Sequence, residues 1–265
     1  MFKVDIQKKF HMNRRSFLSV TMLAAATTLT SHAAEDTRCF EMRVYHPAPG
    51  KLDALNARFR DHTCKLFEKH KITNIGYWLP VDTSDQRLHY VLAYPSREAR
   101  DASWKSFTAD PDWKAAQKAS EVNGKLVDKV ESYFMTATDF SPEVKPSEAP
   151  PRIFELRTYT TTPGNLDRLL ARFRNHTCKL FAKYGMTNLS YWKLMPDQKG
   201  AENTLVYMLA HKDVDAAKAS FTSFRADPDW KAAREASEKE GGGSLTVPDG
   251  VKSLMLKATD YSPTK

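Results

Sequence analysis

The stretch FEMRVYHPAPGKLDALNARFRDHTCKLFEKHKITNIGYW, residues 40–78, returns later in the chain as FELRTYTTTPGNLDRLLARFRNHTCKLFAKYGMTNLSYW, residues 154–192. The two stretches align without gaps, and about 24 of their 39 residues are identical. A second pair, FTADPDWKAAQKASE from Phe107 and FRADPDWKAAREASE from Phe224, follows in the same order, and the copies close with ATDFSP and ATDYSP. The chain is therefore built from two copies of one domain.

Apolar periodicity and turn residues predict the same six elements in each copy. In the first copy we expect a strand at 39–45, a helix at 51–70, strands at 73–79 and 88–94, a second helical region from Ser96 to about residue 121 that is broken at Asp110-Pro111, and a strand at 127–136. The resulting βαββαβ order is that of a ferredoxin-like, α+β unit.

Two such units predict a barrel. A four-stranded antiparallel sheet with both helices on one face leaves its other face uncovered, and a second sheet can cover it. We therefore expect two tandem ferredoxin-like units that form a pseudo-dimeric α/β barrel, with the helices outside and a cavity between the sheets. Pairing between two chains would satisfy the same pattern. The domains are expected at 37–142 and 152–265, joined by a proline-rich linker at 143–151.

Residues 1–33 are typical of an export signal. Residues 13–18, NRRSFL, resemble the twin-arginine (Tat) signal, an apolar stretch continues to about Leu29, and Ser31-His32-Ala33 is a small-x-small cleavage site. The apolar stretch is too short and too rich in hydroxyl side chains to span a bilayer. We expect a mature protein that is periplasmic or secreted, with no stable membrane anchor.

The net charge argues against a nucleic-acid partner, and the cysteine spacing argues against a cysteine-based metal or redox site. Without residues 1–33 the formal net charge falls from +8 to about +4, and no lysine- or arginine-rich run remains, so nucleic acid is not an expected partner. The cysteines Cys39, Cys64 and Cys178 allow at most one disulfide, and none has the C-x-x-C spacing of a metal or redox site.

Three motifs occur in both copies: a Glu-x-Arg-x-Tyr strand followed by Pro-Gly, a Tyr-Trp strand, and Asp-Pro-Asp-Trp. In the first copy these motifs lie at 40–50, 77–78 and 110–113, in that order. In the second copy they lie at 154–164, 191–192 and 227–230. In these motifs the chain resembles the NIPSNAP family over nearly its whole mature length. The resemblance implies the dimeric α/β barrel fold but no particular reaction. Proteins of that fold that degrade haem, oxidise polyketides without a cofactor or isomerise lactones are an analogy for function.

The Glu-x-Arg-x-Tyr strand holds the first set of candidate site residues. Strand alternation places Glu41, Arg43 and Tyr45 on one face, and we expect this face to line the barrel interior. Arg43 is then a candidate to bind a carboxylate or phenolate, with Glu41 or Tyr45 moving a proton. The alternative is an ion pair that ties the sheets together. The second copy offers the equivalent candidates Glu155, Arg157 and Tyr159.

Aromatic strand residues are candidates for the wall of the same pocket, although such residues also build ordinary cores. They are Trp78 and Tyr90 in the first copy and Trp192 and Tyr207 in the second.

The repeated His-Thr-Cys motif predicts a histidine on the buried side of each first helix. Steps of three and four residues place His62 and His176 on the apolar stripe, with Cys64 and Cys178 about 200° away. A Cys/His dyad or a shared metal site within one copy is therefore excluded. Each histidine is either a core-edge residue or a general base or haem ligand at the barrel mouth.

The sequence leaves three functions open. The protein binds a small aromatic or carboxylated molecule in the barrel, or it is a cofactor-free oxygenase or isomerase, or it is an assembly module that self-associates through its sheets. No cofactor is expected, and haem is the one alternative. The sequence leaves open whether the chain is an enzyme.

Overall fold

The structure, a computed structural model, describes residues 1–2, 36–147 and 152–265. Apart from its first two residues, the predicted export signal lies outside the described residues, as does the part of the predicted linker at 148–151. In the described part of the chain, no helix has both the length and the apolar character that crossing a bilayer requires.

The first copy has the expected order of elements. They are β1 (Cys39–Pro47), α1 (Leu52–Arg58), the π-helical turn η1 (Phe59–Thr63), α2 (Cys64–Lys69), β2 (Thr73–Pro80), β3 (Leu88–Tyr94), α3 (Arg97–Ala109), α4 (Pro111–Ser120) and β4 (Val127–Ala137). Ser96 caps α3 by accepting a hydrogen bond from the Ala99 N–H (3.2 Å). Asp110 caps α4 in the same way, and Pro111 occupies its first turn, where no N–H is needed. The predicted break at Asp110-Pro111 is confirmed.

The second copy repeats this order. Its elements are β5 (Ile153–Thr161), α5 (Leu166–Arg172), the π-helical turn η2 (Phe173–Thr177), α6 (Cys178–Lys183), β6 (Thr187–Leu194), β7 (Thr204–His211), α7 (Val214–Ala226), α8 (Pro228–Glu240) and β8 (Thr246–Ala258). Helix α8 has 13 residues where α4 has 10.

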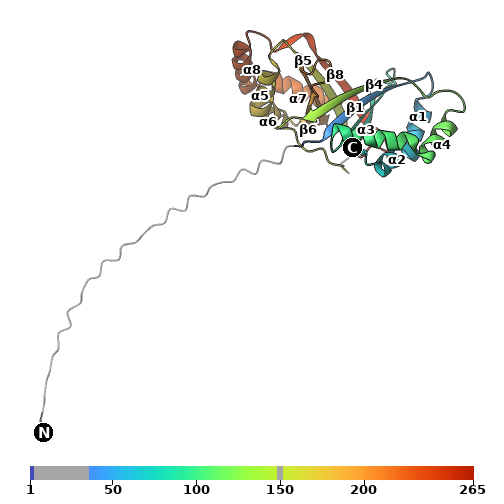
Figure 1. Cartoon of the computed structure of the whole chain (residues 1–265). Helices are drawn as coiled ribbons and strands as arrows, with labels where there is room; N and C mark the ends of the chain where they lie inside the picture. The colour runs from blue at the N-terminus through green and yellow to red at the C-terminus, as the bar shows by residue number, and fades with distance from the viewer. Residues whose placement is uncertain (3–35, 148–151) are drawn as a thin grey trace. The chain divides into compact units, whose positions relative to one another are not determined.

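The eight strands close into one antiparallel barrel in the order β1-β3-β2-β8-β5-β7-β6-β4. Each copy contributes a four-stranded ferredoxin-like sheet, and the pairs β2–β8 and β4–β6 join the two sheets. The helices of the two copies lie on opposite sides of the strands (Figure 1). The predicted barrel is confirmed, and the two sheets pair within this chain.

The barrel interior is filled by apolar side chains from both copies. Phe40 packs against Trp192 with ring centroids 5.8 Å apart, and Phe154 packs against Trp78 at 5.7 Å. Two further apolar clusters lie between each sheet and its own helices. We expected a cavity between the sheets, but an eight-stranded barrel is narrow enough for inward side chains to fill it.

The repeated closing motifs bind each copy to the other. After β4, the hydroxyl of Ser141 accepts a hydrogen bond from the backbone N–H of Tyr191 in β6 (2.9 Å). After β8, the hydroxyl of Ser262 accepts one from Tyr77 in β2 (3.0 Å). Because each tail binds a strand of the opposite copy, these motifs supplement the barrel hydrogen bonds in holding the copies together.

Candidate functional site

The Glu-x-Arg-x-Tyr residues point toward the helices. Phe40 lies in the barrel interior, whereas its neighbour Glu41 accepts hydrogen bonds from Arg100 of α3 (2.8 and 3.0 Å). In β5, Phe154 and Glu155 divide between the two faces in the same way. The prediction that this charged row faces the barrel interior is therefore wrong. Strand alternation shows which residues share a face of the sheet, but it does not show which face lines the barrel. The charged residues lie on the face that provides them with partners of opposite charge, because an unpaired buried charge is costly.

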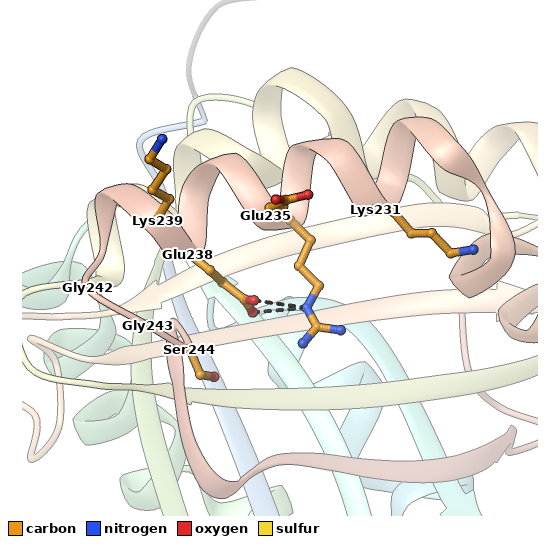
Figure 2. Close-up of a pocket in the computed structure, with 8 residues that line it drawn as sticks. Lys231, Glu235, Glu238, Lys239, Gly242, Gly243 and Ser244 are labelled. Atoms are coloured by element: carbon orange, nitrogen blue, oxygen red, sulfur yellow. Dashed lines mark hydrogen bonds and ion pairs between the residues drawn. The ribbon is translucent and has the colours of Figure 1, made fainter.

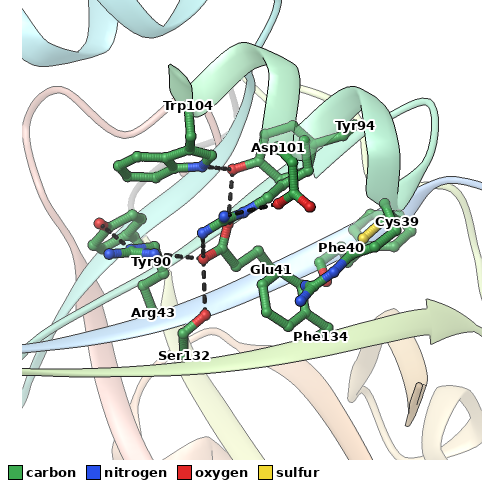
Figure 3. Close-up of polar contacts among 12 residues, drawn as sticks. Cys39, Phe40, Glu41, Arg43, Tyr90, Tyr94, Asp101, Trp104, Ser132 and Phe134 are labelled. Carbon is green, nitrogen blue, oxygen red and sulfur yellow. Dashed lines mark hydrogen bonds and ion pairs between the residues drawn. The ribbon is translucent and has the colours of Figure 1, made fainter. Parts of the chain in front are cut away.

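Glu41 is the centre of a buried network in the first copy (Figure 3). Its side chain is 0% exposed. Its carboxylate accepts hydrogen bonds from Arg43 (2.5 Å), from two nitrogens of Arg100, from the Tyr94 hydroxyl (2.9 Å) and from the Ser132 hydroxyl (2.8 Å). Because these donors come from β1, α3, β3 and β4, the network ties the helix to the sheet.

The guanidinium of Arg43 is enclosed on its other sides. Its Nε donates to the Tyr90 hydroxyl (2.9 Å), and its Nη2 lies 3.4 Å from the Tyr45 hydroxyl. The ring of Trp104 lies 4.4 Å from the guanidinium carbon, and Trp104 Nε1 donates to Tyr94 (2.7 Å). Every nitrogen of this guanidinium therefore has a partner within the protein.

The charges of the first network are mutually stabilised. Burial acts to raise the pKa of Glu41, but hydrogen bonds from Arg100 and the charge of Arg43 lower it to about 2. Burial acts to lower the pKa of Arg43, and the facing Tyr90, Tyr45 and Glu41 outweigh burial and raise it. Burial also raises the pKa of Tyr90 well above its ordinary value. At neutral pH these groups hold their protonation states, which favours a structural role.

The second copy builds a similar network from fewer donors. Arg157 Nη1 and the Ser253 hydroxyl (2.5 Å) donate to one oxygen of Glu155, and His211 Nε2 lies 3.0 Å from the other. Arg157 Nη2 donates to the Tyr159 hydroxyl (3.2 Å). Burial acts to raise the pKa of Glu155, and the His211 hydrogen bond and the Arg157 charge lower it. In this copy a single arginine neutralises the carboxylate.

Three buried polar atoms of the second network have no hydrogen-bond partner. They are Arg157 Nε, the Tyr207 hydroxyl and His211 Nδ1. The atoms that match the first two in the first copy, Arg43 Nε and the Tyr90 hydroxyl, bond directly to each other. Buried polar atoms are nearly always paired, so these three atoms are candidates to bind a water molecule or a ligand.

The two histidines of the His-Thr-Cys motif are exposed, so their predicted place on the buried stripe is wrong. A π-helical turn in each helix is the cause: the Cys64 N–H reaches back five residues to the Phe59 carbonyl. The extra residue in this turn shifts the following side chains, and Thr63 takes the buried position (2% exposed). His62 and His176 line outer grooves, while Cys64 packs against the helix–sheet core.

The four predicted aromatic residues do not share one pocket. Trp78 and Trp192 fill the barrel interior. Tyr90 and Tyr207 lie on the opposite face of each sheet, under the helices. The prediction of a common wall is therefore wrong, since these residues divide between the two faces of their sheets.

The NIPSNAP family model matches residues 40–142 and 154–263. The chain belongs to the NIPSNAP family. No curated protein matches it significantly. This NIPSNAP protein is similar in fold to a candidate monooxygenase from Fusobacterium nucleatum, with 13% identity and a TM-score of 0.55 over 84% of this chain and 92% of that chain. It is also similar in fold to an anthrone oxidase-like protein, with 13% identity and a TM-score of 0.53 over 87% of this chain and 95% of that chain. A NIPSNAP domain protein from Burkholderia xenovorans is 23% identical over 40% of this chain and 99% of that chain, with a TM-score of 0.35.

Within the described residues, no group of three or more His, Cys, Asp or Glu side chains is arranged to hold a metal ion. Cys39, Cys64 and Cys178 are all free thiols, and burial raises the pKa of each to about 11.

The predicted residues did not include the other members of the two networks, which are Tyr94, Arg100, Trp104, Ser132, His211 and Ser253. For two of them, a difference between the aligned copies is a signal that could have been used. Arg100 aligns with Ala217, and His211 aligns with Tyr94. The repeat alignment therefore shows where the two networks diverge, although it does not show which residues form them.

Proposed function

We propose that this NIPSNAP protein binds a small molecule with a carboxylate or phenolate oxygen on an apolar, aromatic body, and that the second copy provides the site. The observation that carries the proposal is the unpaired state of Arg157 Nε and the Tyr207 hydroxyl. Leaving two buried polar groups unpaired costs about 1–3 kcal/mol each. A ligand oxygen between them would remove that cost.

The chemistry around these two atoms selects the ligand. The Arg157 N–H can only donate, and the Tyr207 hydroxyl can donate as well, so an anionic oxygen suits both. The ring of Phe221 lies 4.6 Å from the guanidinium carbon of Arg157, and the ring of Tyr207 lies 6.0 Å from it. These rings offer an aromatic ligand body an apolar contact. The Arg157 side chain as a whole is 13% exposed, whereas its Nε and the Tyr207 hydroxyl are buried.

The first copy supplies a matched control. We would titrate benzoate and phenol into the protein and into the Arg157→Met and Arg43→Met variants, and follow ligand binding by saturation-transfer NMR and calorimetry. Arg157→Met is expected to weaken binding about tenfold or more, because a charge-assisted hydrogen bond is lost. Arg43→Met is expected to lower stability and leave ligand affinity unchanged.

If both variants bind as the unchanged protein does and Arg157→Met raises the melting temperature, then Arg157 serves only the structure. That result would defeat the proposal. Equal loss of binding in the two variants would also contradict it, because the first network has no unpaired atom at the matching position.

A cofactor-free oxygenase is the second candidate, and the buried Glu155–His211 pair favours it. In the tautomer in which the Nε2–H of His211 donates a hydrogen bond to Glu155, Nδ1 has no hydrogen-bond partner and can accept a proton. In such a reaction the base removes a proton from an activated carbon. The resulting carbanion gives its electrons to O₂. One oxygen atom becomes the carbonyl oxygen on that carbon, and the other leaves as water with the two hydrogens of the original CH₂ group. His62 and His176, the predicted bases, are exposed on the outer grooves, whereas His211 lies within the second network.

Oxygen uptake tests this candidate. With anthrone as substrate, the protein is expected to consume one O₂ for each anthraquinone formed, and His211→Gln to lose the uptake, with Tyr94→Phe as the variant at the matching first-copy position. Absence of uptake above a buffer control removes the oxygenase candidate and leaves the binding proposal intact.

A further inference from the structure

The outer groove of the second copy, between α5–α6 and α8, contains a buried arginine whose charge lacks a close partner. Arg172 is 7% exposed. Its Nη1 donates to the Ser237 hydroxyl (3.2 Å), but it lies 4.0 Å from the Glu238 carboxylate, and Nε has no partner. A buried guanidinium at this distance from its carboxylate is poorly compensated.

The first copy shows the same arginine with its charge matched. Arg58 is 6% exposed and donates to the Ser120 hydroxyl (3.3 Å), as Arg172 does to Ser237. Its Nη1 also donates to the Glu121 carboxylate at 3.0 Å. The Nε atoms of both arginines lack a partner, so the difference between the copies is the distance to the carboxylate.

One substitution between the copies explains the longer distance. Arg234 in α8 occupies the position of Gln117 in α4. The Arg234 Nε donates to both oxygens of Glu238 (3.0 and 3.2 Å). Figure 2 shows Glu238 on α8 with these contacts drawn as dashed lines. Glu238 is thereby shared with a second cation. Gln117 carries no charge with which to compete for Glu121.

A cavity lies beside the undercompensated arginine. Its volume is about 210 Å³, and Arg168, Arg172 and His176 contribute to its wall from one side of the first helix. The walls of this cavity include one carboxylate, Glu240, which is exposed. The positive side chains therefore outnumber the negative ones.

The cavity continues into a larger one. A second hollow of about 650 Å³ shares Asn175, His176, Ala233 and Ala236 with the first. Leu180 and the alanines of α8 line it, and Lys179 and Lys183 also belong to its wall. The groove is thus cationic at the Arg172 end and carries an apolar strip beyond it. In the first copy, the groove that includes His62 does not include Arg58 among its lining residues.

We propose that this groove of the second copy binds a small organic carboxylate with a short apolar chain. The carboxylate lies between Arg172 and Arg168, where it supplies the counter-charge that Glu238 shares with Arg234, and the chain lies along Ala233, Ala236 and Leu180. Arginine suits this role because its planar guanidinium can donate two parallel hydrogen bonds to the two oxygens of a carboxylate. The groove is lined by residues of α5, η2, α6 and α8. Arg172 also lies within electrostatic range of Tyr159 and Tyr207 of the second network.

Calorimetric titration with hexanoate tests the site on the unchanged protein and three variants. Arg172→Met removes the cation and is expected to weaken hexanoate binding about tenfold or more. Arg58→Met is the matched control, which is expected to lose stability while binding hexanoate unchanged. Arg234→Gln recreates the first-copy residue, frees Glu238 to pair with Arg172, and is expected to weaken binding several-fold in a protein that folds normally.

Four outcomes would overturn the proposal: no hexanoate binding by the unchanged protein at millimolar concentration, unchanged binding in Arg172→Met, unchanged binding in Arg234→Gln, or inorganic phosphate binding as tightly as hexanoate. The last would show that the apolar strip contributes nothing. Hexanoate has no aromatic ring, whereas the benzoate and phenol titrations report on the Arg157 site, so failure here is distinguishable from failure of the Arg157 site.

Discussion

Replacing Glu41 by glutamine is expected to destabilise the protein more than any matched change in the second copy. The carboxylate is fully buried, and its pKa of about 2 lies well below its ordinary value of 4.5. That difference corresponds to about 3 kcal/mol of stability at neutral pH. Removing the charge also leaves Arg43 and Arg100 without their shared counter-ion, a kind of change that costs about 3–5 kcal/mol in buried pairs.

The pH dependence of this loss has a definite sign. A carboxyl group with a lowered pKa stabilises the folded state at pH values above its unfolded pKa, about 4.5. That contribution is lost as the pH falls toward 2, because the group then binds a proton in both states. The difference in unfolding free energy between the unchanged protein and Glu41→Gln is therefore expected to be constant above about pH 5 and to close between about pH 4.5 and 2.

Urea denaturation followed by circular dichroism, repeated from pH 7 to pH 3, measures both quantities. For a domain of this size, about 3 kcal/mol lowers the melting temperature by roughly 6–12 °C. Glu155→Gln is the matched control and is expected to cost less, because its carboxylate is held by one arginine. A loss below about 1 kcal/mol at pH 7, or a difference that does not shrink in acid, would refute the reasoning.

Three further outcomes are expected, two from the structure and one from the sequence of residues 13–18. Tyr207→Phe removes an unpaired buried hydroxyl and is expected to raise stability by up to about 1 kcal/mol, whereas Tyr90→Phe breaks a hydrogen bond and is expected to lower it by about 1–2 kcal/mol, as urea melts would show. Cys64 and Cys178, whose pKa values burial raises to about 11, are expected to resist iodoacetamide at pH 8 until urea unfolds the protein, as intact mass would report. Changing the arginine pair at 14–15 to lysine is expected to stop export, which cell fractionation and the N-terminal sequence of the mature protein would check.

Most of the fold was predictable from local signals. Apolar alternation located the strands, and Asp110-Pro111 and its copy located the helix breaks. The repeat predicted that two sheets would pair, because one ferredoxin-like sheet leaves a face uncovered. These features depend on short-range stereochemistry and on burial, and both are encoded residue by residue.

The sequence identified several residues of the candidate site, but it did not show on which face of the sheet or helix they lie. Glu41 and Arg43 do form the expected ion pair, yet they lie under α3, on the face of β1 opposite to Phe40, which fills the barrel interior. His62 left the buried stripe because a π-helical turn shifted the helix by one residue, which a regular 3.6-residue period does not reveal.

The sequence by itself determined the duplication, the order of elements and the residue types on each strand face, because these follow from periodicity and turn chemistry along the chain. Only the tertiary structure decided which face meets the helices and which fills the barrel. It also decided that Arg43 and Tyr90 pair while Arg157 and Tyr207 stay open, and that Arg234 draws Glu238 from Arg172. Such outcomes depend on the competition between side chains far apart in sequence for the same partner, and local patterns contain no record of that competition.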